Sequence, residues 1–292
     1  MTLVCTLLTS LEHFKRESAD ADTVMSSPAD QFRHVKALTF DVFGTAVDWR
    51  TTVTEALVHA AEHIQKADEF SSLPEDLQTN LKSMTRDSWG TFAQDWRNSY
   101  GSFIISFVPG ETPWKDIDAH HRDSLLELLE KWHLSGIYSP DEVERLSKIW
   151  HFLAPWPDSS EGLHTLGKRF VVSTLSNGNQ SLLADLNEFG NLGFQRLISA
   201  EDFRAYKPNP ATYLGACRGL GLEPREVAMV AAHLGDLAAA RSHGLKTIYV
   251  ERSREEDWDR DEQRYREAKE WVDLWISQEE AGFIEVARRL GL

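Results

Sequence analysis

The chain has 292 residues, and its 31 lysines and arginines against 46 aspartates and glutamates give a formal charge of −15. This length can bury a full core, and a hydrophobic content of 41% argues against a disordered chain. The acidity argues against nucleic acid or anionic lipid as a partner, and no apolar run is long enough to cross a membrane. Two cysteines, Cys5 and Cys217, cannot form a disulfide framework, so we expect a reducing, cytoplasmic location.

The first 34 residues do not look like part of a core. Their short apolar run, residues 3–8, has no basic residue before it and is followed by four acidic residues. This pattern is untypical of a secretory signal or a mitochondrial presequence. We expect residues 1–34 to be a flexible extension.

Residues 35–40 form an apolar run that ends at Asp41, which predicts a buried strand followed by a loop. The pattern then turns helical, and four helices are expected at about 53–64, 77–96, 125–132 and 143–153. The start of the last helix is indicated by Ser139-Pro140-Asp141-Glu142, a capping box with proline at the first helical position.

After residue 155 strands and helices alternate. We expect strands at 170–175, 196–199, 227–231, 247–250 and 272–276, with helices at 180–189, 210–220, 236–243, 257–271 and from about 279. Such alternation predicts an α/β fold with a doubly wound parallel sheet. The domains expected are a core made of residues 35–50 and 155–292, and a helical cap, residues 51–154, inserted after the first strand.

Polar side chains follow several of the predicted strands. They are Asp41, Ser176-Asn177, Lys207 and Asp236. Each alone is also explained by turn or capping chemistry. Ligands bind at the carboxyl ends of the strands in such a sheet, so the whole set indicates a functional site.

Four sequence motifs carry a family resemblance: FDVFGT (40–45), TLSNGN (174–179), YKPNPATY (206–213) and MVAAHLGDLAAARSHGLKT (229–247). They resemble the four loops of the haloacid dehalogenase superfamily. Within the insertion and just after it, DWR (48–50), FAQDWRNSY (92–100), PWKDID (113–118) and WPD (156–158) resemble the type II L-2-haloacid dehalogenases. The resemblance implies a Rossmann-like, haloacid dehalogenase-like core with an inserted helical cap.

Two positions argue against the phosphatases of that superfamily. These enzymes use an acid two residues after the nucleophile to protonate the leaving alcohol, and the residue here is Phe43. They also hold Mg²⁺ through an acid at the position of Ala232. We therefore expect a reaction that needs no metal and no cofactor.

The resemblance implies a role for each loop. Asp41 would attack the halogen-bearing carbon and form an ester that water then hydrolyses. Lys207 would keep Asp41 ionised, and Asp236 would orient Lys207 or the water. Arg97 and Asn177 would hold the departing halide, with Arg50 as a competitor for the role of Arg97. The substrate would be bound by Ser176 with the backbone amides after Asp41 (Val42 and Phe43), while Thr45 would bond Asp41 and Tyr213 would hold the Lys207 loop.

The chain departs from the branch at Ala231-Ala232-His233, where other members often carry Ser-Ser-Asn. His233 is expected to replace the amide as a donor, to act on water, or to be a structural histidine of the loop. Gly235, where some members place tryptophan, suggests a wider pocket. His120-His121 is expected at the surface, and the charged run 255–270 on a solvated helix face.

We expect a hydrolase of carbon–halide bonds that acts on haloacetate or 2-halopropionate and gives a 2-hydroxy acid. The first alternative is a hydrolase using the same aspartate on a larger, non-halogenated substrate. A phosphatase and a non-catalytic binding protein are further alternatives. The expected partner is a small carboxylic acid, and a homodimer is one possible assembly.

Overall fold

The computed structural model describes residues 27–292, so the predicted extension lies outside the described residues up to position 26. Residues 27–34 differ from the flexible segment that we expected. They contain a short helix, α1 (Pro28–Gln31), and Phe32 is fully buried in the hydrophobic core.

A five-stranded parallel sheet forms the centre of the core, with the strand order β4-β1-β5-β6-β7. The strands are β1 (Ala37–Phe40), β4 (Val171–Thr174), β5 (Val227–Ala231), β6 (Lys246–Val250) and β7 (Leu274–Ile276). Phe40 pairs in register with Thr174 on one side and Val230 on the other, so the three strands end at the same edge. The predicted parallel sheet is confirmed.

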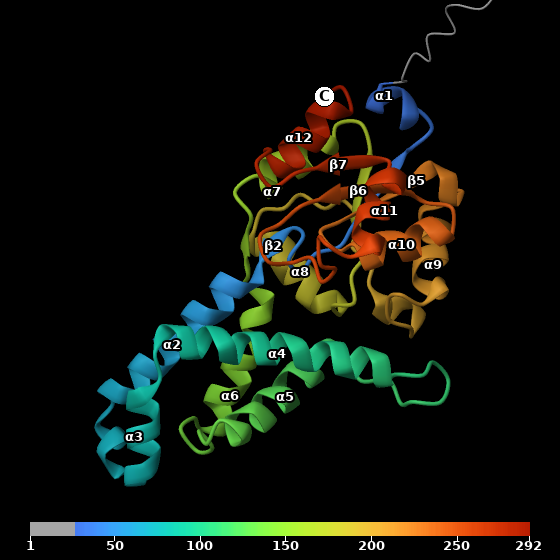
Figure 1. Cartoon of the computed structure of the whole chain (residues 1–292). Coiled ribbons are helices and arrows are strands. Elements are labelled where there is room, and N and C mark those ends of the chain that lie inside the picture. Colours follow the sequence, from blue (N-terminus) through green and yellow to red (C-terminus); the bar gives the residue numbers. More distant parts are fainter. Residues whose placement is uncertain (1–26) are drawn as a thin grey trace, which may run out of the picture.

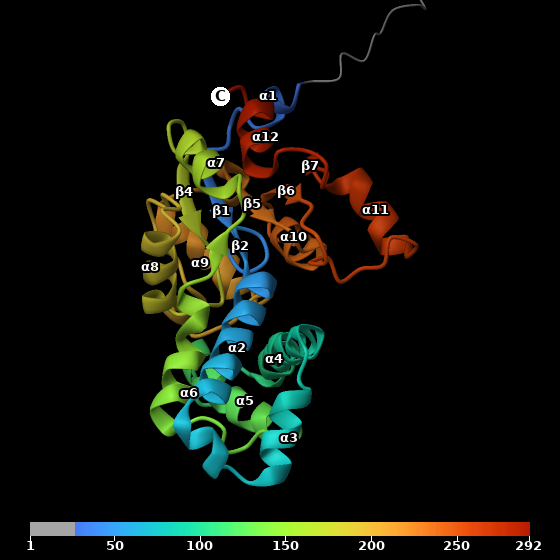
Figure 2. The same ribbon diagram turned by 90° about the vertical axis from the view of Figure 1, so that its left-hand side faces the viewer.

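Side chains alternate between the two faces of the sheet, and each face has its own cluster of buried residues. Leu38, Phe40 and Val230 belong to one cluster, whereas Ala37 and Met229 belong to the other. The first face is covered by α7 (Ser159–Leu166), α8 (Gln180–Phe189) and α12 (Gly282–Arg289). The second is covered by α9 (Pro210–Leu220), α10 (Leu234–Ser242) and α11 (Gln263–Trp271) (Figures 1 and 2). Burial of both faces explains why these strands read as continuous apolar runs.

The helical block lies beyond the carboxyl ends of the strands (Figures 1 and 2). It contains α2 (Trp49–Lys66), α3 (Glu75–Ser83), α4 (Arg86–Ser106), α5 (Ile117–Lys131), α6 (Pro140–Ser147) and the 3₁₀ turns η1 (Asp68–Ser72) and η2 (Lys148–His151). A two-stranded antiparallel ribbon, β2 (Val47–Asp48) with β3 (Ala154–Pro155), lies where the chain enters and leaves this block.

Several predicted elements differ from the structure. The helix expected over 143–153 is α6, which ends at Ser147, followed by the 3₁₀ turn η2. The helix expected over 77–96 is two helices, because the Thr85 side chain accepts a hydrogen bond from the Ser88 amide and starts α4 as a capping box. The strand expected over 196–199 is reduced to two isolated bridges. There the Ile198 N–H donates to the Thr174 hydroxyl rather than to a backbone carbonyl, which interrupts the ladder, while the Ile198 C=O still accepts the Ser176 amide. The charged helix begins at Gln263 rather than near 257.

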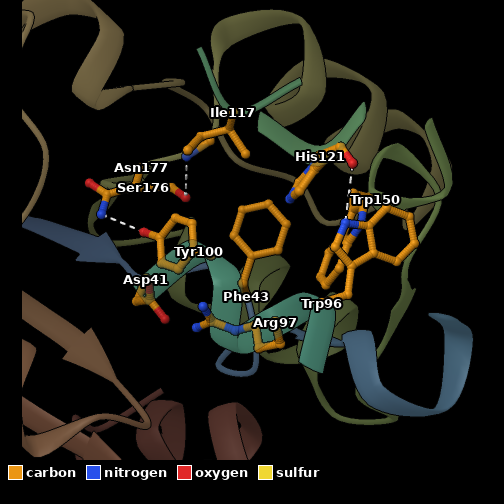
Figure 3. Close-up of a pocket in the computed structure, with 11 residues that line it drawn as sticks. Asp41, Phe43, Trp96, Arg97, Tyr100, Ile117, His121, Trp150, Ser176 and Asn177 are labelled. Carbon is orange, nitrogen blue, oxygen red and sulfur yellow. Dashed lines mark hydrogen bonds between the residues drawn. The ribbon is translucent and has the colours of Figure 1, made fainter. Parts of the chain in front are cut away.

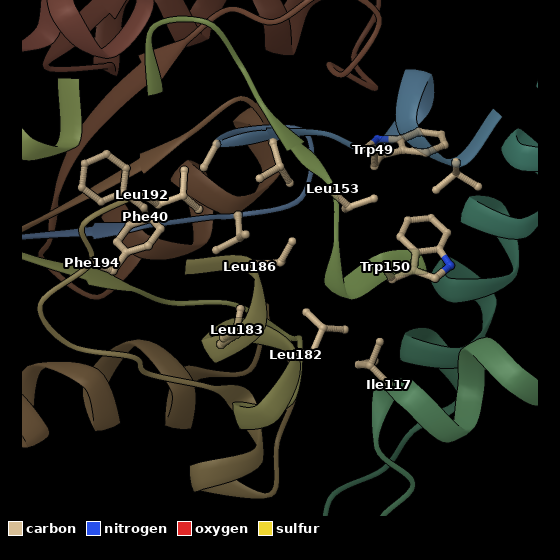
Figure 4. Close-up of a cluster of buried hydrophobic side chains, with 14 of the residues drawn as sticks. Phe40, Trp49, Ile117, Trp150, Leu153, Leu182, Leu183, Leu186, Leu192 and Phe194 are labelled. Carbon is tan, nitrogen blue, oxygen red and sulfur yellow. The ribbon is translucent and has the colours of Figure 1, made fainter. Parts of the chain in front are cut away.

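The first-face cluster continues from the sheet into the helical block. Figure 4 shows this path from Phe40 and Phe194, past the α8 leucines and Leu153, to Trp150 and Ile117. Core and cap therefore share one apolar cluster next to the strand ends. Within residues 27–292, no helix is long and apolar enough to cross a membrane.

Candidate active site

Four neighbouring strands deliver polar side chains to one edge of the sheet. Asp41 follows β1, Ser176 and Asn177 follow β4, His233 and Asp236 follow β5, and Glu255 lies in the loop after β6. Because β4, β1, β5 and β6 are adjacent, these segments converge, as is usual for ligand sites in open parallel sheets.

Asp41 is buried and contacts three donors. Its Oδ1 accepts a hydrogen bond from Nζ of Lys207 at 3.0 Å. Its Oδ2 accepts one from the Thr45 hydroxyl at 2.7 Å, as predicted, and lies 3.2 Å from Nδ1 of His233. Burial alone would raise the pKa of Asp41, but the positive charge of Lys207 and the contacts with His233 and Thr45 hold it well below its usual range. The carboxyl group is therefore ionised, as a nucleophile requires.

Lys207 lies between two carboxylates. Its Nζ also donates to Oδ2 of Asp236 at 2.5 Å, and Oδ1 of Asp236 accepts a hydrogen bond from the Tyr213 hydroxyl at 2.6 Å. Burial would lower the pKa of Lys207, but the charges of Asp236 and Asp41 raise it above its usual value. Asp236 therefore contacts Lys207, one of the two partners expected for it, and the Tyr213 hydroxyl holds the other oxygen of that acid.

A pocket opens in front of Asp41, between the core and the cap (Figure 3). The core contributes Asp41, Phe43, Ser176, Asn177 and Gly178, and the cap contributes Trp96, Arg97, Tyr100, Ile117, His121 and Trp150. The cavity volume is about 30 Å³. Since roughly 10–15 Å³ of such space holds one water, the pocket suits a ligand of few non-hydrogen atoms.

Arg97 extends from α4 toward Asp41 in Figure 3. Its guanidinium carbon lies 4.7 Å from the centre of the Tyr100 ring, and the Tyr100 hydroxyl accepts a hydrogen bond from Nδ2 of Asn177 at 2.5 Å. Arg50, the competing residue, is directed elsewhere: it donates to the backbone carbonyl of Arg254 at 3.2 Å and does not line this pocket. The structure thus brings Arg97, rather than Arg50, to the pocket with Asp41 and Asn177.

The remaining predicted residues are arranged around Asp41 rather than along the pocket wall. Thr45, Lys207, Asp236, Tyr213 and His233 lie behind or beside it, linked by the contacts described above. Val42 differs, because its side chain is buried in the hydrophobic core and does not line the pocket. A role for Val42 through its backbone amide stays a prediction.

Sequence reasoning missed several residues of the site. His120 and His121 are buried, not at the surface, and His121 lines the pocket with its ring stacked on Trp150 at 4.5 Å. Tyr100 had a usable signal, since it lies three residues after Arg97 and shares its helix face. Glu255 was placed on a solvated helix face, but it is only 7% exposed and contacts His233.

The two positions that separate this site from a phosphatase are both inside it. The Phe43 ring lines the pocket, and Ala232 is fully buried next to Thr45, to whose hydroxyl its amide donates at 3.0 Å. Among residues 27–292 no group of three or more His, Cys, Asp or Glu side chains could hold a metal ion.

Comparison with known proteins places this geometry among dehalogenases. The family model of haloacid dehalogenase-like hydrolases matches residues 35–244. The (S)-2-haloacid dehalogenase 1 of Pseudomonas sp. (strain CBS-3) is 30% identical over 224 residues, which cover 75% of this chain and 85% of that protein. The crystal structure of the L-2-haloacid dehalogenase PA0810 has a TM-score of 0.70 at 33% identity, covering 88% of this chain and all of that chain. The defluorinating L-2-haloacid dehalogenase Rha0230 has a TM-score of 0.68 at 31% identity, covering 88% of this chain and 96% of that chain.

Proposed function

The chain belongs to the haloacid dehalogenase-like hydrolase family, and we propose that it hydrolyses the carbon–halogen bond of short 2-haloacids through an ester of Asp41. The observation that carries this proposal is the buried carboxyl group of Asp41, which accepts a hydrogen bond from Lys207 and lines a small pocket that also contains Arg97. The relatives named for 2-haloacid dehalogenase activity support the substrate class.

The first step is a displacement at carbon. A carboxylate oxygen of Asp41 forms a bond to C2 of the substrate, and the carbon–halogen electron pair leaves with the halide. Arg97 and Asn177, which line the pocket, would stabilise the departing anion. Ser176, also on the wall, would hold the substrate carboxylate together with the backbone amides after Asp41. A halide leaves without a proton, so Phe43 in place of an acid does not hinder this step.

The second step releases the product. Water adds to the carboxyl carbon of the Asp41 ester, and the bond between this carbon and the ester oxygen that joins it to C2 breaks. That oxygen, which came from Asp41, takes a proton from the water and leaves as the hydroxyl group of the 2-hydroxy acid. The net products are halide, 2-hydroxy acid and one proton, and the Asp41 carboxylate is restored. Asp236, held by Lys207 and Tyr213, would orient the attacking water.

The alternative with a larger substrate rested on a pocket widened at Gly235. Gly235 does not line the pocket, and the indole nitrogen of Trp258 lies 4.0 Å from the position of an added Cβ there. The small cavity volume favours a short acid. The site does not favour a phosphatase, since neither Phe43 nor Ala232 can replace the acids that such an enzyme needs.

Halide release tests the proposal directly. Chloroacetate, both enantiomers of 2-chloropropionate and fluoroacetate would be supplied in EDTA, with Asp41→Asn as the control. We expect release from chloroacetate and (S)-2-chloropropionate that survives EDTA and is lost in the variant. No release from any of the four, or release that Asp41→Asn retains, would contradict the proposal. The location in the cytoplasm and the homodimer stay predictions.

A further inference from the structure

The two oxygens of Asp41 are not equivalent. An ionised carboxylate offers two lone pairs on each oxygen. Oδ2 is approached by two donors, Thr45 and His233, whereas Oδ1 is approached by Lys207 alone among the described contacts. The Thr45 hydroxyl donates to Oδ2, because an ionised carboxylate has no hydrogen to donate, and it accepts a hydrogen bond from the Ala232 amide. Oδ1 therefore keeps a lone pair free for attack, and Oδ2 does not.

His233 is held from its other side by Glu255. Its Nε2 lies 3.5 Å from Oε2 of Glu255, and the same oxygen accepts a hydrogen bond from the Trp49 indole at 3.0 Å. Gly44 makes room for this arrangement, since an added Cβ would lie 2.0 Å from Oε2 of Glu255. Glu255 is thus a buried side chain held in place beside His233, not a solvent-exposed acid.

We propose that Oδ1 of Asp41 is the attacking atom and that His233, positioned by Glu255, is the charged donor that stabilises Oδ2 during hydrolysis of the ester. This inference rests on the proposed function and assigns a catalytic residue to its second step. After attack by Oδ1, Oδ2 is the carbonyl oxygen of the ester. When water adds to the carboxyl carbon, the π electron pair of the carbonyl moves onto Oδ2, and the negative charge forms where Thr45 and His233 already point. Donors arranged in advance around such an oxygen accelerate acyl transfer.

Glu255 keeps the charge on His233 once Asp41 has lost its own. Burial would lower the pKa of His233, but the carboxylates of Asp41 and Glu255 raise it to about 10. Formation of the ester removes the first of these charges and leaves the second. A second cavity adjoins His233, and the other charged residues that line it are Arg50, Arg97, Arg254 and Asp257. The charge of His233 also acts on Glu256, whose pKa it lowers against the effect of burial. A cation between an ester and a carboxylate is the arrangement that the second step needs.

The two steps can be separated by rapid quenching with (S)-2-chloropropionate in excess. In His233→Ala we expect a burst of about one chloride per enzyme at a rate close to that of the wild type, followed by turnover slowed by roughly 10²–10³-fold. His233→Asn keeps a neutral donor and Glu255→Gln keeps an uncharged partner, so we expect the same burst with smaller losses. Asp257→Asn removes one exposed charge near the cavity without a contact to His233, and it should turn over like the wild type.

Intact-protein mass spectrometry during turnover should show the Asp41 ester accumulating in His233→Ala and not in Asp257→Asn. The inference is overturned if the burst slows as much as the turnover, or if His233→Ala turns over at the wild-type rate. Chloride release by the wild type without an ester in the variants contradicts this inference alone. Absence of chloride release by the wild type contradicts the proposed function and this inference with it.

Discussion

Replacing Lys207 by methionine should destabilise the protein in a manner that depends on pH. Lys207 Nζ lies 3.0 Å from Asp41 and 2.5 Å from Asp236, and the three side chains are only 9%, 12% and 10% exposed. Methionine fills similar space but leaves two buried carboxylates without their shared cation. Removing one partner of a buried ion pair costs about 3–5 kcal/mol, so we expect a loss of that order in the free energy of unfolding at pH 7.5.

The sign of the pH dependence follows from Asp41. In the wild type its pKa is lowered, so its ionised form stabilises the fold above the unfolded value of about 4, and this stabilisation is lost as pH falls through the folded pKa. Lys207→Met removes the positive charge that lowers the pKa of Asp41 most, so this pKa rises relative to the wild type, while His233 and Thr45 still contact the carboxylate. The variant then recovers stability as pH falls through this higher pKa, because the buried carboxyl group becomes neutral. The difference between wild type and variant should shrink between pH 7.5 and pH 4.5.

Urea unfolding at both pH values measures this difference, and Lys246→Met is the matched control. Lys246 pairs with Asp273 at 2.6 Å, but these side chains are 36% and 20% exposed. A pair that reaches solvent contributes at most about 1 kcal/mol, with little dependence on pH in this range. If Lys207→Met lost no more stability at pH 7.5 than Lys246→Met, the role assigned to the buried cation would be refuted.

Three further predictions follow, the first two with matched variants. Gly44→Ala should lose activity in a chloride-release assay and about 1–3 kcal/mol of stability, because φ at Gly44 is +82° and the new Cβ would displace the Glu255 carboxylate. Gly110→Ala is the control: φ there is +85° but the new Cβ meets open space, so the variant should keep its activity. Arg97→Lys should lower kcat/KM for chloroacetate by at least about tenfold, because lysine lacks the planar, multi-donor guanidinium group of arginine. Arg50→Lys is the control and should change kcat/KM less than about threefold. Equal effects of the two substitutions would refute the choice of Arg97. Burial would lower the pKa of His151, but its two carboxylate partners raise it, so its stabilising contribution is present below about pH 6.5 and lost as pH rises through the folded pKa. His151→Gln should therefore destabilise the protein most near pH 6 in thermal unfolding, and a loss that grows with pH would contradict this.

The parts of the fold that could be predicted are those with a local signal. Strands buried on both faces read as short apolar runs; Asp41 directly follows β1, and Asn177 lies three residues after the end of β4. The break at Thr85 was missed because helical periodicity continues across it, while the capping bonds that split the helix involve only short polar side chains.

The parts that could not be predicted depend on contacts distant in sequence. Glu255 lies in a run of charged residues that is typical of a solvated surface. It is brought inward because Arg252, three residues earlier, donates to the backbone of Thr45 and forms an ion pair with Asp158. His121 has no neighbour in sequence that marks it as part of a pocket, since the aromatic ring it stacks on, Trp150, comes from another element.

The route of the oxygen atom is the most direct test of the central claim, an ester of Asp41. A single turnover of (S)-2-chloropropionate by excess enzyme in H₂¹⁸O would be followed by mass spectrometry of the product and of the peptide that contains Asp41. The account predicts ¹⁸O in the Asp41 carboxyl group and ordinary oxygen in the first equivalent of 2-hydroxypropionate, because water attacks the carboxyl carbon of the ester. Label in the product and none in Asp41 would mean that water attacks the substrate directly, which contradicts the account.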